Sequence, residues 1–227
     1  MSGVFITGTD TGVGKTEISL GLMAALQQHG QSALGMKPIA SEGRAGEHGL
    51  RCEDAVRLQA QGSLRVPYER VNPYAFEPPI APHIAAAGAG IKVELARIRH
   101  AYNELAGQTS WVVVEGVGGW RVPLGPSLAV SDLPTALDIP VVLVIGLRLG
   151  CINHSLLTAE AIRDRGVCLA GWVGSLIDPG MSARDENIAT LAALIDAPCL
   201  GIVPWLEQPR ADLVAAHLTI DPILSLG

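Results

Sequence analysis

A glycine-rich segment near the start of the chain carries the strongest chemical signal. Residues 8–16 read GTDTGVGKT and lie between the apolar run Val4–Thr7 and a segment of helical periodicity. In such a loop, glycines let consecutive backbone N–H groups converge on phosphate oxygens, and the helix N-terminus adds a positive partial charge. Lys15 can then reach the β- and γ-phosphates of a nucleotide, and the Thr16 hydroxyl can bind magnesium. The segment therefore predicts a site for nucleotide phosphates.

This segment departs at one position from the usual phosphate-loop pattern, in which a glycine is followed by four residues and then Gly-Lys-Ser or Gly-Lys-Thr. The first glycine of that pattern falls on Thr9, and Gly8 stands one place earlier. A glycine-rich turn that caps a helix for structural reasons alone is the alternative interpretation. The position of Gly-Lys-Thr between an expected strand and an expected helix favours phosphate binding.

Two further charged residues are expected at the same edge of a sheet. Glu115 follows the apolar run 111–114 and precedes Gly116, and a carboxylate at the carboxyl end of a strand can supply the acidic ligand that magnesium needs beside a phosphate loop. Lys37 follows the second expected strand, which ends at Met36. Each has a plainer alternative, because a strand-end glutamate can be solvated and a single lysine is most often an ordinary surface residue.

The elements that must position these residues follow from the apolar patterning. Continuous apolar runs at 4–7, 111–114, 141–145 and 169–173 predict buried strands, and helices are expected over about 15–29, 93–106 and 153–165. Continuous rather than alternating runs, separated by helices, indicate a mostly parallel sheet covered on both faces. The expected fold is a three-layer α/β fold. The glycine- and proline-rich stretch 41–82 predicts functional loops with a short helix near Asp54.

Length and composition limit the classes of function. The 227 residues, 48% of them hydrophobic and 17% charged, predict one folded domain spanning 1–227. A net charge of −6 and an aromatic content of 4% argue against nucleic acid or an anionic membrane as a partner. The start of the chain has no signal-peptide pattern, and no apolar run approaches the ~20 residues that cross a bilayer, so we expect a cytoplasmic protein.

Other conspicuous side chains are expected to be structural. Cysteines 52, 151, 168 and 199 lie far apart without zinc-ligand spacing, which predicts reduced, buried residues. Tryptophans 120, 172 and 205 are expected to pack in the interior. Single histidines such as His83 and His154 more often hydrogen-bond within the structure than act as acid or base.

Several segments together resemble the dethiobiotin synthetase family of the P-loop NTPase superfamily. They are the phosphate loop and residues 37–41 (KPIAS), 115–120 (EGVGGW), 149–154 (LGCINH) and 171–173 (GWV), and the likeness extends from Val4 to Trp205. The resemblance implies a P-loop NTPase fold and a Mg²⁺- and ATP-dependent ligase of biotin synthesis. It implies that 7,8-diaminopelargonate captures CO2 as a carbamate, that the carbamate attacks the γ-phosphate, and that the second amine closes a cyclic urea as phosphate leaves.

The same resemblance assigns roles to residues of this chain. It implies Lys15 and Lys37 as catalytic lysines, and Thr16, Asp54 and Glu115 as ligands of Mg²⁺. Asp54 read alone is a helix-start carboxylate favoured by the helix dipole. The resemblance places the nucleotide against Gly12, Val13, Gly14, Lys15, Thr16, Glu17, Asp54, Glu115, Gly116, Val117, Gly118, Ser175, Leu176, Pro204, Trp205 and Leu206. It places the diamine against Thr11 and Ser41, and its far carboxylate against Gly150, Cys151, Ile152 and Asn153 of the other subunit of a homodimer.

Three positions depart from the family pattern. Ser175 stands where the family usually has an asparagine that reads the adenine edge, and a hydroxyl lacks the paired donor and acceptor of an amide. We therefore predict weaker discrimination among nucleoside triphosphates, with the base held near Pro204, Trp205 and Leu206. Gly12 replaces a common acidic residue and Arg148 a frequent lysine, and neither change removes a phosphate-binding group.

Three other functions are compatible with parts of the pattern. Switch ATPases of partitioning or positioning systems share the architecture, but they carry an extra lysine where this chain has Asp10, and residues 211–227 contain no Lys or Arg for a basic membrane or DNA segment. Amide ligases that activate a carboxylate usually need a fused glutaminase domain, for which 227 residues leave no room. A non-enzymatic nucleotide-binding module gives no reason for Lys37, Ser41 and Glu115 to gather at one edge.

Overall fold

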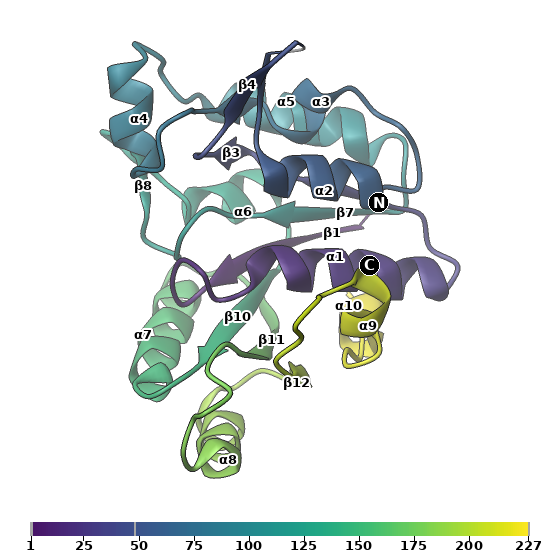
Figure 1. The fold of residues 1–227 in the computed structure, drawn as a ribbon, viewed down its shortest axis with the longest axis vertical. Coiled ribbons are helices and arrows are strands. Elements are labelled where there is room, and N and C mark those ends of the chain that lie inside the picture. The colour runs from purple at the N-terminus through teal and green to yellow at the C-terminus, as the bar shows by residue number, and fades with distance from the viewer. Residues whose placement is uncertain (1, 48, 227) are drawn as a thin grey trace.

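A parallel six-stranded sheet forms the centre of the molecule (Figure 1). The computed structural model describes residues 2–47 and 49–226. The strand order is β12-β11-β10-β1-β7-β2, and every neighbouring pair is parallel. The strands are β1 (Ser2–Gly8), β2 (Ala33–Met36), β7 (Trp111–Glu115), β10 (Val141–Leu147), β11 (Leu169–Leu176) and β12 (Cys199–Val203). From β1 the chain goes to the edge strand β2, returns to β7 beside β1, and then moves outward on the other side through β10, β11 and β12. The carboxyl end of the central strand β1 therefore lies where ligands bind in open α/β sheets.

The expected strands are all present, and the reason is their burial. Every residue of β2, β7 and β10 is buried, as continuous apolar runs predict for a sheet covered on both faces. Strand β12 was not predicted, because its sequence CLGIV is interrupted by glycine and only Leu200 and Val203 are buried.

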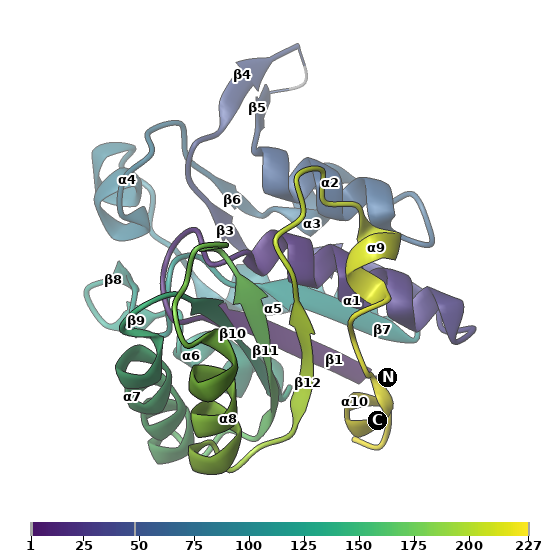
Figure 2. The ribbon, with the colours of Figure 1, turned by 60° about the horizontal axis from the view of Figure 1, so that its bottom comes forward.

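Helices cover both faces of the sheet, which confirms the three-layer α/β fold. Helices α1, α9 and α10 lie on one face and α5, α6 and α7 on the other, with α8 beside α7 (Figures 1 and 2). This placement agrees with right-handed crossovers on either side of β1. The helices are α1 (Lys15–Gln28), α5 (Leu95–Ala106), α6 (Asp132–Leu137), α7 (Cys151–Asp164), α8 (Arg184–Leu194), α9 (Ala211–Ala215) and α10 (Asp221–Leu224). The three predicted helices are confirmed with shifts of one or two residues at their ends.

The stretch between β2 and α5 is more regular than the loops expected for it. It contains α2 (Glu53–Gln61), α3 (Tyr68–Val71) and α4 (Pro82–Gly88), the parallel pair β3 (Ile39–Ala40) and β6 (Tyr74–Ala75), and the hairpin of β4 (Arg44–Gly46) and β5 (Gly49–Arg51). The short pair β8 (Pro123–Gly125) and β9 (Leu128–Ala129) follows β7. The short helix expected near Asp54 is α2. The β4–β5 hairpin projects from the body of the molecule (Figure 2).

Two expectations about buried side chains are wrong in part. Cys52 and Cys151 are buried, but Cys168 and Cys199 are exposed. Trp120 and Trp172 are buried, whereas Trp205 is 56% exposed because it follows the last strand, outside the covered part of the sheet.

None of the helices in residues 2–47 and 49–226 combines the length and the apolar character that crossing a membrane requires.

Candidate functional site

The phosphate loop joins β1 to α1 in a conformation that depends on two glycines. Gly12 and Gly14 have φ of 75° and 91°, in the left-handed region that favours glycine. A Cβ on Gly14 would also come within 2.8 Å of Ser175 Oγ. Gly14 is the residue before the first turn of α1, so the loop delivers its backbone directly to the positive end of that helix.

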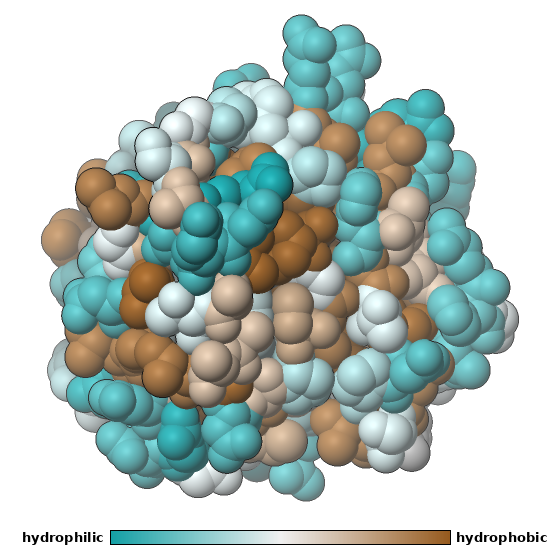
Figure 3. Space-filling model, turned by 90° about the horizontal axis from the view of Figure 1, so that it is seen from below, coloured by the Kyte–Doolittle hydropathy of each residue, from teal (hydrophilic) through white to brown (hydrophobic). Residues whose placement is uncertain are grey.

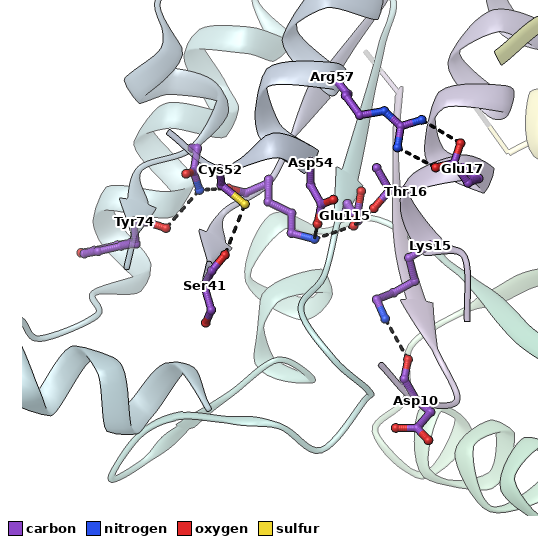
Figure 4. A network of polar contacts seen from close by, with 12 residues as sticks. Asp10, Lys15, Thr16, Glu17, Ser41, Cys52, Asp54, Arg57, Tyr74 and Glu115 are labelled. Carbon is purple, nitrogen blue, oxygen red and sulfur yellow. Dashed lines mark hydrogen bonds and ion pairs between the residues drawn. The ribbon is translucent and has the colours of Figure 1, made fainter. Parts of the chain in front are cut away.

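Lys15 is held against the loop itself. Its Nζ donates to the Asp10 carbonyl oxygen at 2.9 Å, and its side chain is almost fully buried (Figure 4). Burial, together with the positive charge of Lys37, lowers the pKa of Lys15 to about 8. An anion that enters the loop would therefore stabilise the ammonium form of Lys15.

Lys37 lies between two carboxylates. Its Nζ donates to Glu115 Oε1 at 2.5 Å and to Asp54 Oδ2 at 2.9 Å (Figure 4). Lys37 and Glu115 are buried, so the alternatives of a surface lysine and a solvated glutamate are both wrong. Thr16 Oγ1 donates to the same Glu115 Oε1 at 2.9 Å. Side chains from β7, α1, α2 and the residue that follows β2 thus meet at one point.

The charges of this cluster stabilise one another. Burial by itself would lower the pKa of Lys37, but the carboxylates of Glu115 and Asp54 raise it above its ordinary value. Burial of the Asp54 carboxyl acts against its ionisation, yet the charge and hydrogen bond of Lys37 leave its pKa below the usual one. Lys37 is therefore an ammonium and Asp54 a carboxylate at neutral pH.

A buried asparagine fixes where Lys37 and the start of α2 lie. Asn72 Nδ2 donates to the Lys37 carbonyl at 2.6 Å, and Tyr68 Oη donates to Asn72 Oδ1 at 2.9 Å. The Cys52 amide, at the N-terminal cap of α2, donates to Tyr68 Oη at 2.8 Å. This chain of hydrogen bonds connects the backbone of Lys37 to the turn that carries Asp54. Because its members are buried, it holds one geometry.

The oxygen atoms of Thr16, Asp54 and Glu115 fit a magnesium ion. Glu115 Oε2 is buried without a hydrogen-bond partner in the described residues, so one oxygen of that carboxylate is left for another ligand. In the part of the chain that the structure describes, no three His, Cys, Asp or Glu residues gather into a metal site. Two carboxylates and a hydroxyl match the way magnesium is held in nucleotide sites, where phosphates and water complete the shell.

A cleft of about 830 Å³ lies over this cluster. The predicted site residues that line it are Thr11, Gly12, Gly14, Lys15, Thr16, Glu17, Lys37, Ser41, Asp54, Glu115, Val117 and Gly118. Ser41 Oγ donates to the Ile80 carbonyl at 3.0 Å, which leaves its lone pairs free to accept. Val13 is buried beneath the loop, and Gly116 follows the end of β7. The structure thus brings together the residues expected for phosphate, metal and amine.

The residues expected to hold the base lie next to one another but do not line that cleft. Ser175 and Leu176 end β11, and Ser175 pairs with Val203, the last residue of β12. Pro204, Trp205 and Leu206 therefore follow directly beside them. A Cβ on Gly14 would lie 2.8 Å from Ser175 Oγ, so Ser175 and the residues beside it adjoin the phosphate loop.

The residues expected to receive the far carboxylate stand at the start of α7. Gly150 precedes the helix with φ of 93°, and Cys151, Ile152 and Asn153 form its first turn. They do not line the cleft. Arg148, just before them, donates to Asp10 Oδ2 at 2.8 Å and so links this segment to the phosphate loop.

Several cleft residues were not predicted from the sequence. Arg57 on α2 forms a bidentate ion pair with Glu17, and Arg44, Arg51 and Cys52 also line the cleft. Arg57 lies three residues after Asp54, on the same helical face, and this spacing is the one signal that could have found it. No local pattern indicates the other three.

Known proteins resemble this chain along nearly its whole length. A sequence profile described as an AAA domain matches residues 2–211. The ATP-dependent dethiobiotin synthetase BioD of Cellvibrio japonicus is 51% identical over 220 residues, covering 97% of this chain and 96% of that protein. BioD of Pseudomonas aeruginosa is 51% identical over 224 residues and covers 98% of each chain, and BioD of Aromatoleum aromaticum is 49% identical over 218 residues, covering 95% and 96%.

The chain belongs to the dethiobiotin synthetase family. The resemblance seen in its motifs is confirmed by identity spread over the whole length rather than confined to the phosphate loop. In this chain the phosphate loop, the two lysines and the acidic residues lie around one cleft.

Solved structures with the same fold belong to another function class. MinD of Aquifex aeolicus in complex with MinC aligns with a TM-score of 0.57 at 16% identity, covering 97% of this chain and 88% of that one. MinD of Pyrococcus horikoshii bound to Mg-ADP aligns with a TM-score of 0.54 at 15% identity, again covering 97% and 88%. This likeness confirms the P-loop NTPase fold that the sequence predicted. At such low identity it does not extend to function, whereas the dethiobiotin synthetases match in sequence as well.

Proposed function

We propose that this protein closes the cyclic urea of dethiobiotin from 7,8-diaminopelargonate and CO2, using ATP and releasing ADP and phosphate. One observation carries the proposal: Lys15 and Lys37, the phosphate loop and Ser41 all face one cleft in a chain that is 51% identical to named dethiobiotin synthetases. A single domain of residues 1–227 would carry the reaction. Because no side chain has to form a covalent bond, the site must supply alignment and charge neutralisation.

The two lysines divide the neutralisation of charge. Lys15, buried beside the loop, is placed to meet the β- and γ-phosphates. Lys37 can turn from its carboxylates toward the cleft, where a carbamate oxygen and the γ-phosphate have to approach in line. Two anions repel each other, so an ammonium between them lowers the barrier to their reaction. Lys15 and Lys37 are accordingly assigned as the catalytic residues.

Thr16, Asp54 and Glu115 would hold Mg²⁺, which neutralises phosphate charge when bound. The buried Glu115 Oε2, without a partner in the described residues, supports this assignment. Lys37 must leave the two carboxylates before they can bind a cation, because its Nζ lies between them. The same movement would bring its charge toward the reacting phosphate.

The diamine is assigned to Thr11 and Ser41 in the cleft and to Gly150–Asn153 of a second subunit. Ser41 Oγ keeps acceptor capacity for an amine while it donates to the Ile80 carbonyl. The Cys151 amide donates to the Arg148 carbonyl, but α7 has no side-chain cap, so the N–H groups of Ile152 and Asn153 in its first turn suit a carboxylate. Leu149 beside it is 93% exposed, and apolar surface lies between polar side chains on the face that includes α7 and α8 (Figure 3). A homodimer that covers this face would complete the substrate site.

The nucleotide base is assigned to Ser175, Leu176 and Pro204–Leu206. Trp205, with more than half of its surface exposed, offers a ring face beside the loop on which a base can stack. The four cysteines are free thiols, which agrees with a protein that acts in the cytoplasm, where thiols stay reduced.

The test is to follow cyclic urea and ADP together. With 7,8-diaminopelargonate, bicarbonate, Mg²⁺ and ATP, the two products should form in equal amounts. ADP release that needs DNA, lipid or a protein partner and no diamine would assign the protein to the switch ATPases instead. Amide formation from ammonia would assign it to the amide ligases.

A further inference from the structure

Arg57 and Glu17 join the two helices that carry Thr16 and Asp54. Arg57 Nη1 and Nη2 donate to Glu17 Oε1 and Oε2 at 2.6 and 2.7 Å (Figure 4). The side chains are partly buried, with 35% and 26% of their surface exposed. A bidentate pair of this kind fixes the relative orientation of the two groups as well as their distance. It therefore holds α1 and α2 in one arrangement at this point.

Each partner stands close to a proposed magnesium ligand. Glu17 directly follows Thr16 in the first turn of α1, and Arg57 lies three residues after Asp54 on the same side of α2. All four line the cleft. The Arg57–Glu17 ion pair therefore joins α2 to α1 about one helical turn beyond Asp54. It lies close to the place where Thr16 and Asp54 would bind a common ion.

The other hydrogen bonds between α2 and α1 lie at the far end of α2, away from the cleft, where Gln61 Nε2 donates to Gln27 Oε1 and Gln27 Nε2 donates to the Gln61 carbonyl, each at 2.8 Å. The start of the helix is tied to Tyr68 through the Cys52 amide, and Leu58 packs on the strand beneath, where a Cβ on Gly35 would lie 2.8 Å from Leu58 Cβ. Beside the cleft, the side-chain hydrogen bonds from α2 to α1 in the described residues are therefore those of the Arg57–Glu17 pair.

We propose that Arg57 is a positioning residue, which holds Glu17 so that Asp54 and Thr16 reach the same cation. The inference rests on the proposed function only through its magnesium site. Partners that orient metal ligands typically contribute 10–100-fold to metal affinity, so we expect loss of the pair to weaken divalent-cation binding in the nucleotide complex by about tenfold.

The test measures Mn²⁺ affinity in the presence of ADP, from the electron paramagnetic resonance signal of free Mn²⁺. Arg57→Gln and Glu17→Gln should each weaken it about tenfold, and the double variant no more than either, because both changes break one interaction. Arg57→Lys should retain part of the affinity. The matched control is Arg70→Gln, which removes an ion pair with Glu104 of similar exposure (35% and 32%) outside the cleft and should stay within about twofold of the wild type.

A second measurement separates positioning from direct nucleotide contact. ADP affinity in EDTA should not fall in Arg57→Gln, since the positioning role acts through the cation. A loss there, or a loss of Mn²⁺ affinity in Arg57→Gln that Glu17→Gln does not share, would overturn the inference, as would unchanged affinity in both variants. If the wild type binds no Mn²⁺ in the presence of ADP, both the proposed magnesium site and the inference about Arg57 are wrong. Urea formation tests the proposed reaction separately.

Discussion

The position of Lys37 predicts that removing its ammonium increases metal binding while it abolishes catalysis. Lys37 Nζ lies 2.5 Å from Glu115 and 2.9 Å from Asp54, the place that a cation between these carboxylates would take. In Lys37→Met the two carboxylates lose their counter-ion. Leaving a buried charge unpaired costs roughly 3–5 kcal/mol, and Asp54, 39% exposed, favours the lower end of that range.

The expected magnitude follows from that penalty. A cation that binds between the carboxylates recovers about 3 kcal/mol, which corresponds to roughly 10²-fold in affinity. Mn²⁺ should therefore bind Lys37→Met about 10²-fold more tightly than the wild type in the absence of nucleotide. The assay is a titration followed by the signal of free Mn²⁺, and the ion should also raise the thermal unfolding temperature of this variant more than that of the wild type.

Lys15→Met is the matched control, because it removes another buried ammonium of the same cleft. Lys15 Nζ donates to the Asp10 carbonyl and not to the carboxylates, so this variant should gain less than about tenfold. An equal gain in both variants would mean that overall charge, and not the place of Lys37, controls metal binding. No gain in Lys37→Met would refute the interpretation that its ammonium lies in the cation site.

Three further predictions concern the lysines and the base. Lys15→Ala and Lys37→Ala should each lower turnover by at least ~10²-fold, as expected when one electrostatic contact to a transition state is lost, and wild-type turnover in either would contradict its role. Since the pKa of Lys15 is about 8, it is charged below that pH, and binding of metal-free ADP above pH 8 must take up a proton. ADP affinity measured by calorimetry should therefore fall with rising pH, by up to about tenfold per unit, in the wild type but not in Lys15→Met. With Ser175 in place of an amide, CTP and GTP should support turnover comparable to ATP, and Ser175→Asn should favour ATP; strict use of ATP by the wild type would contradict this.

Much of the fold and the centre of the site could be predicted because their signals are local. Continuous apolar runs identify β7 and β10, and Gly-Lys-Thr between a strand and a helix identifies the phosphate loop. The place of Glu115 follows from the rule that carboxyl ends of parallel strands share one edge. Strand β12 lacked such a signal, since its glycine and exposed positions break the apolar run.

What escaped prediction depends on contacts between distant segments. Arg57 and Glu17 are 40 residues apart, so no local pattern predicts their ion pair, although the family resemblance placed Glu17 beside the nucleotide. The exposure of Trp205 likewise depends on where the last strand ends relative to the helices that cover the sheet. Asp54 needed the family resemblance, because a carboxylate at a helix start has a sufficient local explanation in the helix dipole.

The central claim is tested most directly by one incubation of the purified protein with 7,8-diaminopelargonate, bicarbonate, Mg²⁺ and ATP, in which cyclic urea and ADP are measured together. If the proposed function is correct, both products appear in equal amounts and omission of the diamine stops both. ADP formed at the same rate without diamine, and without any urea, would contradict it.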